Sequence, residues 1–158
     1  MKIEAAAAAI IGLIGIGVLY RLPPAQAEWQ EPGAASQTRS VWDGVYTKEQ
    51  AGRGDKLYKN QCAACHGATL SGGEAAPPLA GGEFLSNWNG LSLGDLFERI
   101  RVSMPQDHPG RLSREQNAEI LSYMLSINKF PAGKKELEHQ TELLKGIRFE
   151  ATRPETKQ

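Results

Sequence analysis

The residues Cys62-Ala63-Ala64-Cys65-His66 decide how the rest of the chain is interpreted. They contain the only 2 cysteines of the 158-residue chain, and an imidazole follows the second thiol directly. A Cys-x-x-Cys-His run is the attachment signature of a c-type haem. At the end of a helix this spacing lets two thiols reach two vinyl groups on one porphyrin edge. We therefore expect Cys62 and Cys65 to bind one haem c covalently, with His66 as an axial iron ligand.

A bare Cys-x-x-Cys pair also occurs in redox disulfides and in zinc sites. A thioredoxin-like site needs a βαβ context, and no segment here alternates convincingly enough to predict strands. A zinc site needs two further ligands at matching spacing, and only His108 and His139 remain, far apart in the sequence. Haem attachment is the interpretation that the motif favours.

Six-coordinate iron needs a second axial ligand, and Met104 is the best candidate. It precedes Pro105 in a loop between two predicted helices, and a residue before proline favours an extended backbone. Met124 is the rival, but it lies on the apolar side of a predicted helix, as a core residue does. His108 lies in a polar turn and is the weaker alternative, and we expect His139 on the surface.

An axial histidine is normally oriented through its other ring nitrogen, which donates to a carbonyl or carboxylate. The stretch 67–91 is rich in glycine and proline, so it is predicted to be a long loop that crosses this face of the haem. We expect the carbonyl of Pro77 to be the acceptor, because the adjacent prolines stiffen the loop there. Leu79 would pack on the ring.

Composition limits the classes of function. The chain has 18 Lys and Arg against 18 Asp and Glu, which argues against a strongly basic nucleic-acid binder and against an acidic solvating tail. Apolar residues make up 41% and charged residues 23%, as in ordinary globular proteins. This length favours one domain, and two cysteines exclude a disulfide framework.

The N-terminal segment differs from the rest of the chain. Residues 1–27 combine Lys2, an apolar run over 5–20 and the sequence Ala25-Gln26-Ala27, which is typical of a secretory signal peptide cut after Ala27. The run is shorter than the roughly 20 residues that span a bilayer. We expect export to the periplasm, and contact with a membrane only if this segment is retained as an anchor. Residues 28–40 are predicted to be a flexible leader.

The remaining sequence predicts an all-α domain over 41–133, with three main helices and long loops wrapped around the haem. Helices are expected to begin after the caps Thr47, Ser92 and Ser113, the first and third through capping boxes. Gly52 and Gly54 lie inside the first helix, which suggests that another backbone comes close there. Residues 134–158 form a charged extension, either a short docked helix near 138–146 or a solvated tail after Phe149.

With these features in place, the sequence resembles the class I monohaem cytochromes c over about residues 45–128. The strongest element is CAACH followed downstream by Met104-Pro105. The resemblance implies that Gly54 and Tyr58 of the first helix cross the last helix at Tyr123. It also implies that Pro77-Pro78-Leu79 is the family's proline segment, with Pro77 accepting from the axial histidine.

The stretch Phe84 to Gly90 and the helix after it resemble soluble bacterial cytochromes that accompany periplasmic dehydrogenases, including quinoprotein types. This resemblance implies that Trp88 lies against the haem near a propionate, although an ordinary core aromatic would fit as well. With both axial positions filled, no open iron site remains for substrate. We therefore expect an electron carrier of a respiratory chain and not an enzyme.

The expected partners are redox proteins, with no role for nucleic acid. A dehydrogenase or a quinol-oxidising complex would be the donor, an oxidase or another protein the acceptor, and the carrier itself a monomer. Two alternatives stay open, a membrane-anchored haem subunit of a larger oxidoreductase and a haem sensor or peroxidase with a labile methionine. Basic residues of helices that flank the haem segments are the candidates for steering a partner: Lys56, Lys59, Arg99 and Arg101.

Overall fold

The computed structural model describes residues 39–74 and 76–155, and the six α-helices of this part of the chain define its architecture. The predicted signal segment 1–27 and the leader up to residue 38 lie outside the described residues. In chain order the elements are β1 (Arg39–Ser40), the 3-10 helix η1 (Val41–Asp43), α1 (Lys48–Gln61), α2 (Ala63–His66), α3 (Gly82–Trp88), α4 (Leu93–Ser103), α5 (Arg114–Ile127), α6 (Thr141–Lys145) and β2 (Ile147–Arg148). The all-α prediction is confirmed. None of the helices described is long and apolar enough to cross a membrane.

The three predicted caps begin the three main helices. The side chain of Thr47 accepts from the N–H of Gln50 at 3.1 Å, and Ser92 and Ser113 each complete a reciprocal capping box. Capping residues satisfy backbone donors that the first turn of a helix leaves open. The side chain of Gln50 is buried and makes two hydrogen bonds to the backbone of Leu137. Its Nε2 donates to the carbonyl of Leu137 at 3.0 Å, and its Oε1 accepts from the N–H of Leu137 at 2.7 Å.

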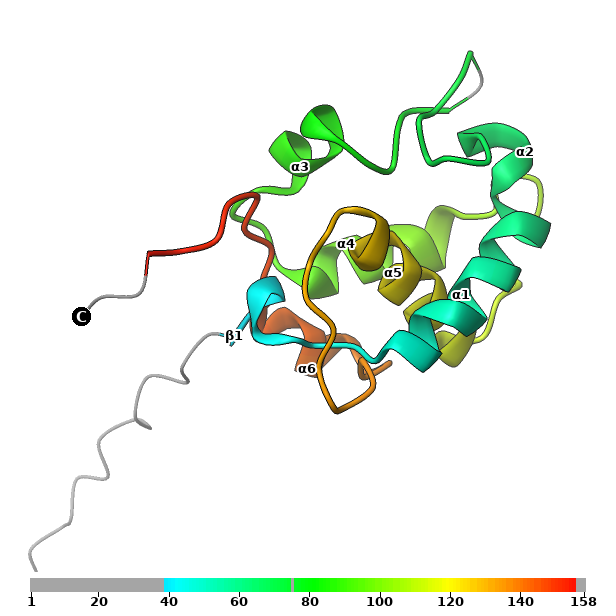
Figure 1. Ribbon diagram of the computed structural model, residues 1–158. Coiled ribbons are helices and arrows are strands. Elements are labelled where there is room, and N and C mark those ends of the chain that lie inside the picture. Colours follow the sequence, from blue (N-terminus) through cyan, green and yellow to red (C-terminus); the bar gives the residue numbers. More distant parts are fainter. Residues whose placement is uncertain (1–38, 75, 156–158) are drawn as a thin grey trace, which may run out of the picture. The chain divides into compact units, whose positions relative to one another are not determined.

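Helices α1 and α5 cross at the centre of the fold (Figure 1). The crossing lies at Gly54, which is buried and directly beside the backbone of Glu119. The rings of Tyr58 and Tyr123 pack next to it, with centroids 5.4 Å apart. Gly52 is different, because it is exposed and a side chain there would meet nothing within 4 Å. The expectation of a close backbone approach is therefore wrong for Gly52.

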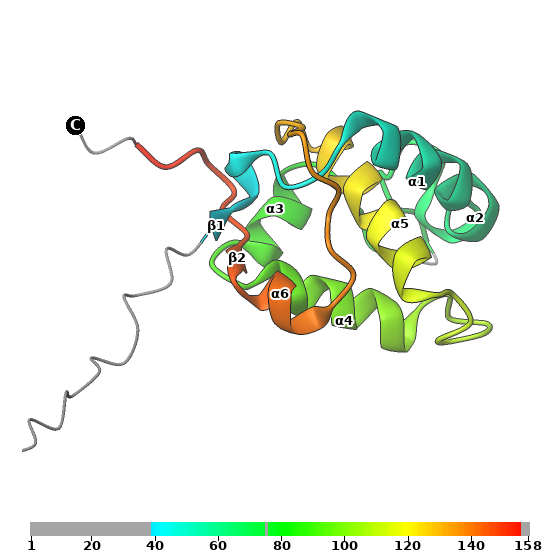
Figure 2. The same ribbon diagram turned by 90° about the horizontal axis from the view of Figure 1, so that it is seen from below.

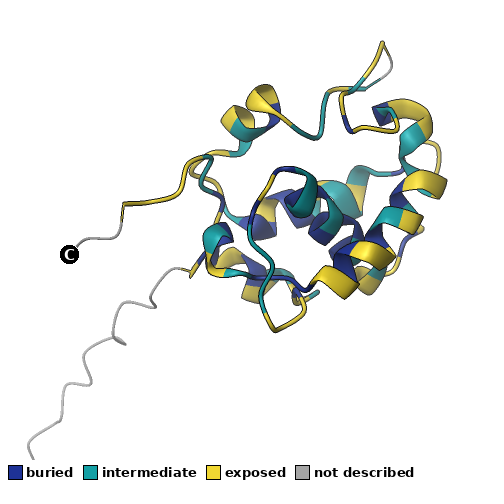
Figure 3. Ribbon diagram, viewed as in Figure 1, coloured by how far each residue is buried: buried dark blue, intermediate teal, exposed yellow. Residues whose placement is uncertain are grey.

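The charged extension after residue 133 belongs to the packed domain as far as Phe149. Helix α6 packs along α4, and β2 pairs in parallel with β1, so the C-terminal extension lies beside the first residues that the structure describes (Figure 2). Phe149 is fully buried, and its ring meets those of Phe84 and Phe130 edge to face. Figure 3 shows that much of the segment after Phe149 is exposed. The structure thus contains the docked helix, over Thr141–Lys145, and its exposed residues after Phe149 also agree with the other alternative.

Two boundaries differ from the sequence analysis. The loop predicted over 67–91 contains α3, a helix with Gly81 at its N-cap and only Phe84 fully buried, so it lacks both signals by which helices are recognised. Residues 39 and 40, assigned to the leader, form β1, where Arg39 pairs with Ile147. A two-residue strand has no alternation that a sequence pattern could reveal.

Candidate functional site

The two cysteines and His66 lie in one turn where α1 ends. Cys62 closes α1, and its N–H donates to the carbonyl of Tyr58 at 2.8 Å. Its own carbonyl accepts from the N–H groups of Cys65 and His66, at 3.1 and 3.0 Å. Both cysteines are free thiols, Cys62 half-buried and Cys65 exposed. The turn therefore places two thiols and one imidazole together at the end of a helix.

His66 is buried at 7% exposure, and its ring has a defined orientation. Its Nδ1 lies 2.9 Å from the carbonyl oxygen of Pro77. Because a carbonyl only accepts, Nδ1 must carry a proton in this contact, and in the neutral ring Nε2 then holds the lone pair. A neutral imidazole with Nε2 available is the form that binds iron.

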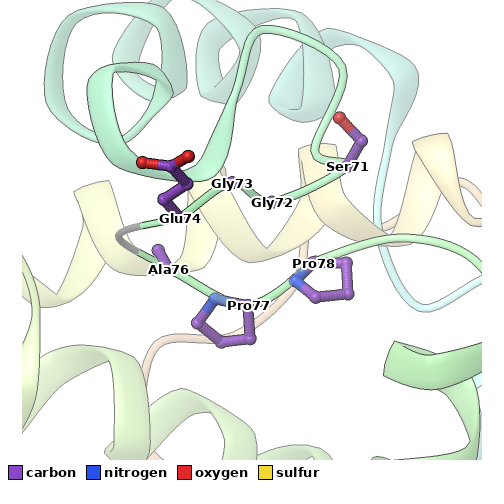
Figure 4. Close-up of a pocket in the computed structure, with 7 residues that line it drawn as sticks. All are labelled: Ser71, Gly72, Gly73, Glu74, Ala76, Pro77 and Pro78. Atoms are coloured by element: carbon purple, nitrogen blue, oxygen red, sulfur yellow. The ribbon is translucent and has the colours of Figure 1, made fainter.

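The loop after His66 folds back on itself (Figure 4), and the contact of His66 with Pro77 lies on its returning side. The N–H of Gly72 donates to the carbonyl of His66 at 2.9 Å, and the N–H of Leu79 donates to that of Leu70 at 2.8 Å. Gly72 has φ +75°, and a Cβ atom there would lie 2.6 Å from the nitrogen of Pro78. Only glycine fits at this approach. Residues 71–74 and 76–78 line a shallow, open hollow of about 540 Å³.

Burial favours the neutral forms of the Cys62 thiol and the Tyr58 hydroxyl. Burial raises the pKa of the Cys62 thiol to about 11, while the positive charge of Arg111 acts in the opposite direction. Burial also raises the pKa of Tyr58, whose hydroxyl donates to the carbonyl of Gly67 at 2.6 Å. The hydroxyl of Tyr58 thus fixes the backbone directly after His66.

Met104 lies at the C-terminal end of α4 in an extended conformation, with φ −125° and ψ 151°, and its side chain is half-buried. Met124 lies in the core of α5 at 1% exposure. The loop that starts at Met104 returns to the thiols, since Arg111 contacts the side chain of Gln61, the neighbour of Cys62. The role of Met104 as the second ligand stays a prediction.

The other histidines lie on the surface and pair with carboxylates, His108 with Asp107 at 3.1 Å and His139 with Glu115 at 3.3 Å. Among the residues described, no group of three His, Cys, Asp or Glu side chains forms a further metal site.

The remaining predicted residues lie near the core. Leu79 and Trp88 are half-buried and pack against it. The ring centroids of Trp88 and Phe84 lie 6.5 Å apart, and the Phe84 ring also packs against that of Phe149. A place for Trp88 beside a propionate stays a prediction.

Sequence reasoning did not single out Arg111 or Asn128. Arg111 is distant in sequence from Gln61, and only the fold brings them together. Asn128 is the C-cap of α5 and hydrogen-bonds to the loop at Leu79 and Gly81. An asparagine at a helix end is a common cap. The sequence therefore does not reveal that Asn128 also bonds to the loop at Leu79 and Gly81.

Parts of the chain are similar to known proteins. Residues 49–124 match the family described as cytochrome c oxidase, cbb3-type, subunit III. A curated relative, the Cbb3-type cytochrome c oxidase subunit CcoP of Azospirillum brasilense, is 29% identical over 92 residues, covering 48% of this chain. The match spans only 30% of the length of that relative. The solved structure of the sulfane dehydrogenase SoxCD from Paracoccus pantotrophus matches with a TM-score of 0.48 and 21% identity, covering 69% of this chain and 62% of that one.

Over residues 49–124 the chain is similar to a cytochrome c domain, which supports the class I type that the resemblance implied. Domains of this kind bind haem c and transfer electrons. The residues present fit that group, because two free thiols, a buried imidazole with a fixed tautomer and a thioether at the start of a neighbouring loop form a suitable donor set.

Proposed function

We propose that the protein is a periplasmic one-electron carrier with one covalently bound haem c. Cys62 and Cys65 would form the two thioether bonds, and His66 and Met104 would supply the axial ligands. The observation that carries the proposal is the contact of His66 Nδ1 with the Pro77 carbonyl, which leaves Nε2 free beside the two thiols. When bound, the haem iron supplies a one-electron couple. The protein's residues hold and orient it and limit its contact with water.

The residues act on the electron transfer in different ways. The hydrogen bond from His66 to Pro77 makes the imidazole a stronger electron donor and favours the oxidised iron. The thioether of Met104 favours the reduced iron and raises the potential relative to two histidines. With both positions filled, no substrate site is left on the metal. We propose a carrier that receives electrons from a dehydrogenase or quinol-oxidising complex and passes them to a terminal acceptor.

The export of the chain is part of the proposal. A signal peptide over residues 1–27, cut after Ala27, would deliver the protein to the periplasm as a free monomer. Intact mass spectrometry of purified protein tests this, since a mature chain that begins at Glu28 supports it. A mass that still includes residues 1–27, together with recovery of the protein in the membrane fraction, would contradict it.

A fixed haem subunit of a larger oxidoreductase is the second candidate. The likeness to an oxidase subunit favours it, because that protein is by its name part of an enzyme complex. This candidate differs from the free carrier in its attachment and not in its chemistry. Purification under mild conditions distinguishes the two, since a subunit stays with its oxidoreductase and a carrier does not.

Denaturing electrophoresis with haem staining tests the cofactor directly. We expect the wild-type band to stain and the Cys62→Ala/Cys65→Ala variant to lose the stain. His139→Ala is a matched control that removes a surface histidine outside the motif, and it should stain like the wild type. A stain that is lost from the wild type on denaturation, or retained by the double variant, would refute covalent attachment.

A further inference from the structure

The side chain of Asn128 connects the end of α5 to the loop that carries Pro77. Its Nδ2 group donates to the carbonyls of Leu79 and Met124, at 3.0 and 2.9 Å. Its Oδ1 accepts from the N–H of Gly81 at 3.0 Å. The residue is 9% exposed, so these bonds are protected from water. One amide thus holds both a helix end and two positions of the loop.

The loop needs this external support because of its sequence. Pro77 and Pro78 have no N–H group, so neither can donate a hydrogen bond that would fix its own position. The next residue, Leu79, is held on both sides: its N–H donates to Leu70 at 2.8 Å and its carbonyl accepts from Asn128. The position of the Pro77 carbonyl therefore depends on how firmly Leu79 is held.

We infer that Asn128 is a positioning residue for the axial histidine. It fixes the segment whose Pro77 carbonyl accepts from His66 Nδ1, although it touches neither the thiols nor the imidazole in any contact described here. This inference rests on the proposed function, since it requires His66 to bind the haem iron. Asn128 then tunes the electron donation of His66 to the iron through the strength of the His66–Pro77 bond.

The three contacts explain why an amide is suited to this position. Two carbonyls require donors, and one N–H requires an acceptor, and an asparagine side chain provides both. A carboxylate would place a negative oxygen against the carbonyl of Leu79. An alanine would leave the Gly81 N–H and the Leu79 carbonyl without these partners in a buried place, which favours movement of the loop.

The test compares Asn128→Ala with the wild type in the full, haem-loaded chain. Spectroelectrochemistry gives the reduction potential, and NMR of the ferrous protein gives the exchange rate of the His66 Nδ1 proton. A weaker His66–Pro77 bond makes the imidazole a poorer donor, so we expect a higher potential, with the oxidised-to-reduced equilibrium shifted toward the reduced form by about two- to fivefold, the size of one net hydrogen bond or less. The Nδ1 proton should exchange several-fold faster.

Ser122→Ala is the matched control on the same helix. The Ser122 hydroxyl is buried and has two acceptors for its one proton, the side-chain oxygen of Gln50 at 2.9 Å and the carbonyl of Ala118 at 2.8 Å, on the side of α5 that faces α1. Its loss should lower the unfolding temperature but leave the potential and the proton exchange unchanged. If Asn128→Ala does not load haem, Asn128→Ser, which is small and polar but lacks the amide, is measured in its place.

The outcomes distinguish failure of the positioning role of Asn128 from failure of the proposed function. A potential and an exchange rate equal to those of the wild type, in a loaded Asn128 variant, would overturn the positioning role and leave the proposed function intact. Equal shifts in Ser122→Ala would also overturn it, because general loosening would then explain them. If His66→Ala keeps an unaltered six-coordinate haem spectrum, the proposed function itself fails.

Discussion

Gly54 in α1 and Glu119 in α5 approach so closely that no side chain fits between them. A Cβ atom on Gly54 would lie 1.8 Å from the carbonyl oxygen of Glu119 and 2.5 Å from its carbonyl carbon. Heavy atoms in backbone contact cannot come this near, and a backbone oxygen cannot rotate away as the end of a flexible side chain can. The crossing of α1 and α5 therefore requires glycine at position 54.

Gly54→Ala should destabilise the protein strongly. Overpacking in a tight interior contact typically costs 1–3 kcal/mol, and because the clash is with backbone, we expect the free energy of unfolding to fall by about 3 kcal/mol. Urea denaturation followed by circular dichroism measures it.

Gly52→Ala is the control, on the same helix. A side chain at Gly52 meets nothing within 4 Å. Alanine is the better helix former, so this variant should be more stable than the wild type by up to about 1 kcal/mol. Equal losses of stability in the two variants would mean that the close approach of Gly54 to Glu119 does not determine the loss of stability in Gly54→Ala.

The second prediction concerns the choice between the two internal methionines. Met104→Leu should abolish the far-red sulfur-to-iron band if the half-buried Met104 supplies the thioether, as we propose, whereas Met124 is a core residue of α5. Met104→His should keep a six-coordinate, low-spin haem with a lower potential, because an imidazole favours ferric iron more than a thioether does.

Met124→Leu conserves volume and should cost less than about 1.5 kcal/mol of stability, with the far-red band unchanged. Absorption spectra of the oxidised proteins decide the assignment. Loss of the band in Met124→Leu and its persistence in Met104→Leu would exchange the roles of the two residues.

The elements that the sequence predicted correctly are those whose signals are local. The caps at Thr47, Ser92 and Ser113 begin helices, as the spacing of polar and apolar residues indicated. The motif at Cys62 to His66 also depends only on neighbouring residues, so the haem class of the domain followed from it. Helix caps and attachment motifs can be recognised from a single sequence, because their residues are close together in the chain.

The features that sequence analysis missed depend on long-range contacts. Helix α3 is held by its buried Phe84 against Phe149, a residue of the C-terminal extension. The parallel pairing of β1 with β2 and the support of the Pro77 loop by Asn128 likewise join segments far apart in the chain. In a single sequence the residues that make such contacts look like any other apolar or polar residues.

The third prediction follows from Glu98 in α4, which joins α4 to the C-terminal extension. Its carboxylate accepts two bonds from the Arg101 guanidinium, one at 2.7 Å, and one from the Thr141 hydroxyl of α6. These contacts, first that of Arg101 and then that of Thr141, lower the pKa of Glu98 to about 2. A depressed folded-state pKa stabilises the protein above the unfolded value of 4.5, and this contribution is lost as the pH falls toward 2.

We therefore expect the wild type to lose stability relative to Glu98→Gln between about pH 5 and pH 2. The difference between the two should be largest at neutral pH and shrink in acid. Urea midpoints at pH 7, 4.5 and 2.5 measure it. A pH-independent difference would show that the ionised form of Glu98 contributes nothing.

The fourth prediction concerns electron transfer to and from partners. Two of the four basic residues considered for steering are already paired, Lys59 with Asp55 at 2.7 Å and Arg101 with Glu98. Arg111 is a better candidate, because it is exposed and contacts Gln61, next to the Cys62 thiol at which the haem would be attached. A charge at the edge of the cofactor guides docking and raises the association rate more than the affinity.

Arg111→Ala should slow reduction by the physiological donor at low ionic strength and weaken the salt dependence of the rate. Raising the salt from 0.01 to 0.15 M shortens the screening length from about 30 to about 8 Å, so a steered encounter slows over that range. Lys48→Ala is the matched control: it removes the same charge at the opposite end of α1, about 20 Å away along a helix of 14 residues. Stopped-flow rates across the salt range decide the matter, and equal effects of the two variants would show that total charge, and not Arg111, governs docking.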